Sequence, residues 1–390
     1  MILIFSMLSV YIIALVDLNN CSKSLRSFVS IIIGVYFSIL IGFSFQLGVD
    51  WLFYFELYNG ASNSLLFIEP LYLFINDLFS LLNFNYVAYS FIIVFAFYFS
   101  LIRFFGKRSK KVTICIALSF SLMLFFTVEA KRQVIAMIIF ISISVRLLEK
   151  ERLFLYYISV LLAALVHVSA IFLILVPALT KYNPCSKKQN FLIVIFLLLS
   201  MYKLDLIAVV NDVFLKSISN EIYEKIEYYI FVAKENDNVA FNINNLIKTA
   251  VFASMVVFYC KIEAYAKNEK LLQTLPAMKG CVLAYFFVSV FFSGFGVFSD
   301  RLSVYFLPHY VLLISWIIAM SGSMSTRFAI LLATLIVFFT SFYRSTLNDY
   351  FSIHYSNYEG ILMGDKLDDP MRLNERTSDV RNHFINKSLK

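Results

Sequence analysis

The sequence predicts an all-α, polytopic integral membrane protein, and three observations lead to this fold class. Of the 390 residues, 61% are apolar and only 15% are charged, whereas soluble domains are about 45–50% apolar and about 25% charged. Apolar runs of helical length recur along most of the chain. The alternating segments of about ten residues that are typical of a membrane β-barrel are not found. A chain this apolar needs lipid to cover part of its surface.

The apolar runs approach the roughly 20 residues that cross the hydrocarbon core of a bilayer. They lie at about 1–17, 29–46, 87–105, 112–128, 131–148, 153–180, 190–209, 244–263, 275–297, 303–321 and 327–343. We therefore expect about 11–12 transmembrane segments in one membrane domain, 1–343, followed by a polar C-terminal tail, 344–390. The first run lacks a basic n-region and a small-x-small cleavage site, so we expect a retained helix instead of a signal peptide.

Residues 66–82 are a poor membrane span. Glu69, Pro70, Asn76 and Asp77 interrupt the run, and a carboxylate in mid-membrane costs about 2.5–3.5 kcal/mol. We expect an interfacial or re-entrant helix here. Residues 47–86 contain no Lys or Arg, whereas the loop Arg103–Lys111 holds five basic residues. The positive-inside rule then places 47–86 outside the cytoplasm and the basic loop in the cytoplasm. An odd number of crossings must therefore separate them, and 87–105 supplies one only if 66–82 does not cross the membrane.

The longest uncharged run, 153–180, contains His167 as its only residue that could be charged near neutral pH. As one straight helix it would measure about 42 Å, more than one crossing needs. Two alternatives remain: one tilted crossing, or two half-helices that turn near His167. We favour the second, because it places the basic loop after the run inside and a second loop, 203–245, outside.

The net charge of +8 does not indicate a nucleic-acid partner, because the basic residues flank apolar runs and no recognition motif accompanies them. The five cysteines (an odd number) are scattered, which argues against a disulfide framework. No metal-ligand cluster, phosphate-binding loop, GxSxG or dinucleotide fingerprint is present in the sequence. We therefore expect neither a metal nor another cofactor.

Two arginines are candidates for binding phosphate. Arg132 and Arg301 each stand between apolar runs, at turns that we place outside. A guanidinium offers a planar fork to phosphate oxygens, so the two together could clamp a pyrophosphate. The ordinary alternatives are a snorkelling helix-start residue for Arg132 and, for Arg301, interfacial anchoring or an ion pair with Asp300.

His167, Asp50 and Glu69 are candidates for proton transfer. An ionisable side chain in an apolar run usually faces an interior cavity, and an imidazole there could move a proton. Either carboxylate could deprotonate a sugar hydroxyl. The alternatives are a packing role for the histidine and ordinary loop positions for the acids. In the second loop, Tyr223 and Tyr228 could stack on sugars, or be ordinary interfacial aromatics.

Several short motifs occur in a characteristic order between Gln46 and Tyr310. They are Gly48-x-Asp50 followed by Tyr54, then Glu69, then Arg132 with Ala136, then Ala163-x-x-x-His167-x-Ser169-Ala170, and Arg301 with Tyr305. In this order and at helix ends, the motifs resemble the EpsG family of Wzy-type polysaccharide polymerases. One departure is that the arginine often found before the Gly-x-Asp is absent, since Phe43–Leu47 contains no basic residue.

The resemblance implies a glycosyltransferase in the bacterial inner membrane. Such a polymerase joins oligosaccharide repeat units carried on undecaprenyl pyrophosphate, at the outer face, into O-antigen or a similar surface polysaccharide. The resemblance also implies site residues: Asp50, Glu69 and His167 as catalytic residues, and Arg132 and Arg301 as pyrophosphate ligands. As partners it implies a flippase and a chain-length regulator of the same pathway.

Other membrane functions stay open. A flippase or other transporter would show repeats with matched broken helices, and only one broken segment is found. An O-antigen ligase would use similar arginines and a histidine. A membrane acyltransferase would need an acidic or polar partner beside its histidine, and we expect His167 to lack one. The sugar and the linkage are not determined by the sequence.

Overall fold

A computed structural model describes residues 2–18, 22–45, 47–48, 50–60, 68–199, 227, 243–292, 297–346, 355 and 359–360. The chain divides into two compact units. Unit 1 comprises Met1–Ser144, Tyr157–Ile171 and Ser321–Lys390, and unit 2 comprises Val145–Tyr156 and Phe172–Met320.

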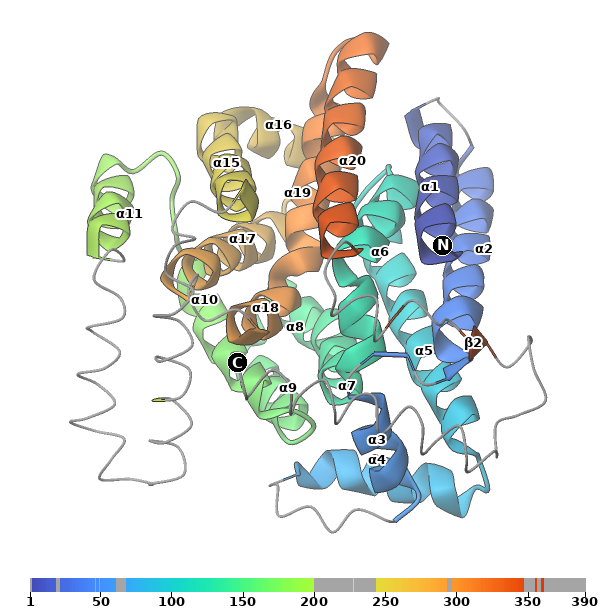
Figure 1. The fold of residues 1–390 in the computed structure, drawn as a ribbon. Helices are drawn as coiled ribbons and strands as arrows, with labels where there is room; N and C mark the ends of the chain where they lie inside the picture. Colours follow the sequence, from blue (N-terminus) through green and yellow to red (C-terminus); the bar gives the residue numbers. More distant parts are fainter. Residues whose placement is uncertain are drawn as a thin grey trace. The chain divides into compact units, whose positions relative to one another are not determined.

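The elements of unit 1 are mostly long apolar helices (Figure 1). In chain order they are α1 (Ile2–Ala14), η1 (Leu15–Leu18), α2 (Lys23–Gly42), β1 (Ser44–Phe45), α3 (Trp51–Tyr58), α4 (Pro70–Leu81), α5 (Tyr86–Gly106), α6 (Val112–Glu129), α7 (Lys131–Ile139), the π-helical η2 (Phe140–Ser144), α20 (Met324–Thr346) and β2 (Glu359–Gly360). Two further elements, α9 (Leu153–Ala164) and the 3₁₀ helix η3 (Val168–Leu175), contribute residues to both units.

Within the described part of the chain, five helices are long and apolar enough to cross a membrane. They are Ser24–Gly42, Tyr86–Gly106, Val112–Glu129, Thr274–Phe291 and Ser299–Met320. A sixth span results if the bent pair Thr249–Val257 and Tyr259–Asn268 counts as one. Shorter apolar helices accompany them, including α1, α4 and α9. The prediction of an α-helical polytopic membrane protein is thereby confirmed.

Helices α2 and α5 pack closely because α2 presents small residues every fourth position, at Gly34, Ser38 and Gly42. A Cβ atom built on Gly42 would lie 2.6 Å from the Phe91 Cα atom of α5. Next to this contact the rings of Phe43 and Phe91 stack at 4.4 Å. Small residues at such spacing let the backbones of membrane helices approach each other.

We expect Gly42→Ala to destabilise the protein, because the added methyl group meets backbone that must shift instead of a side chain that can rotate. Overpacking of this kind costs about 1–3 kcal/mol. Thermal unfolding of detergent-purified protein measures the effect. The matched control is Gly106→Ala on α5, where a Cβ would meet nothing within 4 Å. Equal unfolding temperatures for the two variants would contradict the close approach of α2 and α5.

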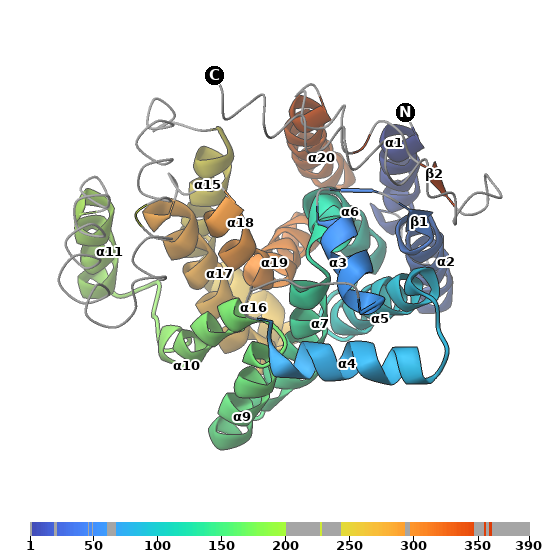
Figure 2. The same cartoon turned by 60° about the horizontal axis from the view of Figure 1, so that its bottom comes forward.

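Helix α4 differs from the other helices of unit 1. Its 12 residues span about 18 Å, less than the hydrocarbon core. Figure 1 shows it lying crosswise to α1, α2 and α20, and Figure 2 shows it beside α3 and α7. One face is exposed and apolar, including Phe74 and Leu81 at 61% and 78% exposure, whereas Tyr72 and Asn76 are buried. These features are those of an interfacial helix, as the sequence predicted.

The end of unit 1 that contains Glu129, here called the Glu129 end, also holds the start of the C-terminal tail. β1 pairs with β2 in an antiparallel register that places Ser44 opposite Gly360. The Tyr355 hydroxyl donates a hydrogen bond to Glu129. At the opposite end of α2, Arg26 donates to the carbonyl of Lys110 in the basic loop. Tyr355 and the strand Glu359–Gly360 of the tail therefore lie at the end remote from the basic loop.

From this arrangement we expect residues 59, 83 and 359 to lie on the outer side of the membrane and residue 110 on the inner side, because the basic loop is retained inside. In a variant lacking the five native cysteines, single cysteines at Asn59, Asn83 and Glu359 should react with a membrane-impermeant maleimide in intact cells. A cysteine at Lys110 should react only after permeabilisation. Protection of position 359 alongside labelling at 59 would overturn the placement of the tail.

Unit 2 is built around α17, as three contacts show. The rings of Phe252 and Phe286 stack at 4.3 Å, and those of Tyr285 and Tyr310 lie 4.8 Å apart. Gly280 of α17 faces Thr180, whose backbone nitrogen would lie 3.0 Å from an added Cβ. The elements that lie wholly in this unit are α8 (Val145–Glu149), α10 (Val176–Leu179), α11 (Lys187–Leu199), α15 (Ile243–Val257), α16 (Tyr259–Asn268), α17 (Thr274–Phe291), α18 (Val297–Ser303), η7 (Val304–Phe306) and α19 (Leu307–Met320).

The predicted single helix at 244–263 is wrong in one respect: α15 and α16 meet at a bend of 71°. Neither Pro nor Gly occurs between residues 243 and 268, so the cause is not a helix breaker. α16 instead exposes the charged residues Lys261, Glu263 and Lys267. Charged side chains are costly inside the bilayer, which favours a turn out of the spanning direction.

Candidate functional site

Glu69 is held at the start of α4 by the proline that follows it. A residue before proline is restricted to extended backbone, and Glu69 has φ −65° and ψ 133°. Pro70 is tolerated at the first helical position because its missing N–H would have no helical partner there. The Glu69 side chain makes no capping hydrogen bond with α4. Its carboxylate is therefore available to other elements of unit 1, although it is only 5% exposed.

His167 lies in the break between α9, which ends at Ala164, and η3, which begins at Val168. The predicted interruption of the long apolar run is confirmed. A helix end leaves carbonyl groups without partners, and a helix start leaves N–H groups without partners. Here the start of α4 and the end of α9 supply each other with a partner, since the Leu71 N–H of α4 donates to the Leu165 carbonyl, just after α9, at 3.1 Å. This hydrogen bond holds the break beside Glu69.

Arg132 lies in the first turn of α7, directly after the interruption at Ala130 that separates α7 from α6. Its Nη1 donates to Glu69 Oε2 at 2.7 Å. The Tyr54 hydroxyl of α3 also interacts with the guanidinium, and the Phe53 ring lies 5.6 Å from its Cζ atom. The arginine is therefore positioned by residues of two other elements, α3 and the start of α4, and keeps 19% of its side chain exposed.

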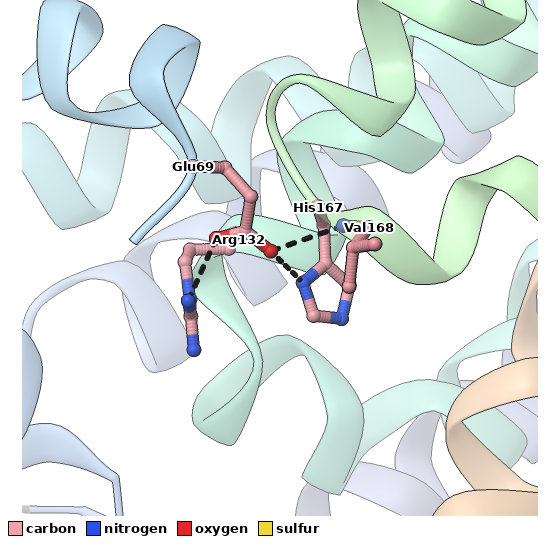
Figure 3. Close-up of polar contacts among 4 residues, drawn as sticks. All are labelled: Glu69, Arg132, His167 and Val168. Carbon is pink, nitrogen blue, oxygen red and sulfur yellow. Dashed lines mark hydrogen bonds and ion pairs between the residues drawn. The ribbon is translucent and has the colours of Figure 1, made fainter. Parts of the chain in front are cut away.

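The Glu69 carboxylate joins these elements, as Figure 3 shows. Oε2 accepts from Arg132, whereas Oε1 contacts His167 Nδ1 at 3.0 Å and accepts from the Val168 N–H at 3.0 Å. We call Glu69, Arg132 and His167 the Glu69 cluster. Its members are separated by up to 98 residues in the sequence and come from α4, α7 and the break after α9.

The cluster keeps the carboxylate ionised. Burial alone would raise the pKa of Glu69, but the hydrogen bonds from His167 and the Val168 N–H, with the charge of Arg132, lower the pKa from 4.5 to about 2. The stabilisation from these contacts is therefore complete above the ordinary carboxyl pKa and is lost as the pH falls toward 2. A carboxylate of such low pKa is a weak base near neutral pH.

The ionised carboxylate also sets the tautomer of the imidazole. A carboxylate only accepts hydrogen bonds, so the proton of neutral His167 must lie on Nδ1. Nε2 is then the nitrogen that carries a lone pair, and it points away from Glu69 (Figure 3). A carboxylate–imidazole pair of this kind orients a histidine to accept a proton at Nε2.

Comparison with known proteins identifies the family. The model of the EpsG family matches residues 27–359, which is most of the chain. The chain belongs to the EpsG family. Membership in it indicates a membrane protein of polysaccharide biosynthesis. Neither a curated protein nor a solved structure matches the chain.

The sequence-predicted site residues of this EpsG-family protein differ in how the structure places them. Glu69, Arg132 and His167 are in direct contact. Asp50 is the residue before α3 and is half-buried, and its backbone carbonyl accepts from the Tyr54 N–H at 3.1 Å. It therefore stands one helical turn before a residue that touches Arg132.

The other predicted site residues are Arg301, Tyr223 and Tyr228. Arg301 belongs to unit 2 and lies within helix α18. The prediction of a turn at this position is wrong, because the helix continues through η7 into α19. Tyr223 and Tyr228 lie outside the described residues.

Two features of the site were not recognised from the sequence. Tyr54 was part of the motif order, but its contact with the Arg132 guanidinium was not predicted. The statement that His167 lacks an acidic partner is also wrong, since Glu69 fills that role across 98 residues. A local sequence window cannot contain such a partner. The Glu-Pro pair at 69–70 is the signal that could have indicated a carboxylate directed away from its own helix.

Proposed function

We propose that this EpsG-family protein is a glycosyltransferase of the Wzy type. It polymerises oligosaccharide repeat units carried on undecaprenyl pyrophosphate, at the outer face of the bacterial cytoplasmic membrane. The observation that carries the proposal is the Glu69 cluster, which combines an oriented imidazole with an arginine in a chain of this family. Such a pair supplies what glycosyl transfer from a pyrophosphate requires: a base for the attacking hydroxyl and a cation for the leaving group.

In the proposed reaction, the hydroxyl of the acceptor unit loses its proton to His167 Nε2. Its oxygen attacks the anomeric carbon of the growing chain, and the bond between that carbon and the pyrophosphate oxygen breaks. The lipid pyrophosphate leaves with the electron pair. General-base catalysis of this type contributes about 10²–10⁴-fold.

Arg132 stabilises the charge that develops on the pyrophosphate. Its Nη1 is used by Glu69, whereas its Nε donates to no atom of the described residues. A guanidinium that is already oriented by a carboxylate reorganises little when phosphate arrives. We propose Arg301 as a second pyrophosphate ligand.

In the same proposal Glu69 is a positioning residue and not the base, because its low pKa makes it a weak proton acceptor. Asp50 lies one helical turn before Tyr54, and we propose that it contacts the acceptor unit. Tyr223 and Tyr228 stay proposed contacts to sugar. A flippase and a chain-length regulator are the proposed protein partners.

Deletion of the gene in its native host tests the function. A polymerase deletion should leave single repeat units on the surface, which migrate as one short band in a gel of the surface polysaccharide. Loss of every repeat unit would instead indicate a flippase. Polymer that accumulates on its lipid carrier without reaching its final acceptor would indicate a ligase.

A further inference from the structure

A group of buried polar side chains lies between α4 and α5 and is not used in the reaction above. Tyr72 and Asn76 are four residues apart on α4 and so share one face of that helix. Tyr89 lies on α5. Their exposed fractions are 0%, 4% and 0%, respectively. We call these three side chains the Tyr72 group.

The polar atoms of the Tyr72 group lack hydrogen-bond partners among the described residues. This holds for the Tyr72 hydroxyl, the Tyr89 hydroxyl and both amide atoms of Asn76. The three side chains lie near one another, because the side chains of Tyr89 and Asn76 both approach the Tyr72 hydroxyl. None of them, however, reaches another with hydrogen-bond geometry.

A purely structural role does not account for these atoms. Burying a polar group without a partner costs free energy. A helix face that only packed against α5 would be more stable with phenylalanine and leucine, which fill similar volume. Sequences that break this rule usually do so at functional sites. A single hydroxyl of this kind, such as that of Tyr98, does not indicate a ligand, but three such side chains gathered beside Tyr54 and Arg132 do. The Tyr72 group therefore indicates a ligand that supplies the missing hydrogen bonds.

The group is continuous with the Glu69 cluster. The Tyr54 and Tyr72 rings meet edge to face at 6.1 Å, and the Tyr54 hydroxyl interacts with Arg132. The charge of Arg132 also acts on the Tyr72 hydroxyl. A ligand bound at the Tyr72 group would thus lie beside the residues to which we assign the chemistry.

The chemistry of the group selects a neutral, hydroxylated ligand. Phenol hydroxyls and an amide both donate and accept hydrogen bonds, as the hydroxyls of a sugar require. A pyrophosphate would instead prefer the cationic fork of Arg132. We propose that Tyr72, Asn76 and Tyr89 bind the hydroxyl groups of the acceptor sugar, and this inference rests on the function proposed above. Because all three side chains are buried, this proposal requires α4 to shift away from α5 before the sugar can bind.

The test uses full-length protein in lipid nanodiscs and, as probe, the lipid-linked repeat unit isolated from the deletion strain. Tyr72→Phe, Asn76→Leu and Tyr89→Phe should each raise the apparent KM for this unit by about tenfold, the loss of roughly one neutral hydrogen bond. Their unfolding temperatures should equal or exceed that of the parent, since each change removes an unsatisfied buried polar group.

Tyr98→Phe is the matched control. Tyr98 is also a buried α5 tyrosine whose hydroxyl has no partner among the described residues, but it lies about 13 Å along the helix from Tyr89. It should leave KM unchanged. An unchanged KM in stable Tyr72→Phe and Tyr89→Phe proteins would overturn the subsite. Failure of the parent protein to form any polymer from the unit would instead overturn the proposed function.

Discussion

Replacing Arg132 by alanine is expected to abolish polymer, with yield falling by about 10²-fold or more. The physical reason is the loss of a preorganised cation at the leaving pyrophosphate, for which removing one donor typically costs this factor. Arg132→Lys should rescue only part of the activity, because an ammonium keeps the charge but not the planar fork. The readout is the ladder of surface polysaccharide in a strain that expresses only the variant.

Abundance must be measured with this experiment, because Arg132→Ala also removes a partner from the buried Glu69 carboxylate, and uncompensated buried charge destabilises proteins. Arg152→Ala, which removes an exposed arginine elsewhere, controls for loss of charge. A normal ladder from an abundant Arg132→Ala protein would refute the assignment. Arg301→Ala should give the same phenotype, and the double variant should be little worse than either single one, since residues that act as a unit are not additive.

Replacing His167 by asparagine is expected to lower the rate of polymerisation by about 10²–10⁴-fold while the protein stays folded. The asparagine amide nitrogen occupies nearly the place of Nδ1, so it can still donate to Glu69 Oε1. It offers no nitrogen lone pair in the place of Nε2. The variant thus separates the base from the hydrogen bond that holds the break after α9. Initial rates with the lipid-linked repeat unit, at matched protein concentration, measure the effect.

Glu69→Gln complements this variant. A glutamine oxygen can accept from His167 and Val168, but its amide nitrogen then faces Arg132 with a donor instead of an acceptor. We expect reduced activity through mispositioning of Arg132. Glu56→Gln, on an exposed carboxylate of α3, should be neutral. If His167→Asn polymerised at the parent rate, His167 would be a structural residue, and the base would have to be sought elsewhere, first at Asp50.

The helices of the chain could be predicted from its apolar runs, because a membrane-spanning segment must satisfy every backbone polar group internally. The run at 153–180 was longer than one crossing needs and contained His167 near its centre, so a break there was the favoured alternative. Residues 66–82 were interrupted by polar residues and a proline, so a non-spanning helix could be predicted there. The bend between α15 and α16 could not, because neither Pro nor Gly marks it.

The sequence by itself determined the membrane class and the candidacy of Glu69, Arg132 and His167, since these follow from local hydrophobicity and local charge. It favoured, but did not determine, a non-spanning helix at 66–82 and a break near His167. Only the tertiary structure decided that one carboxylate joins the arginine and the histidine. It likewise decided that Tyr355 and the strand Glu359–Gly360 of the tail lie at the Glu129 end. The physical reason is that such contacts depend on how helices distant in the sequence pack, and no single segment of the chain determines the free energy of that packing.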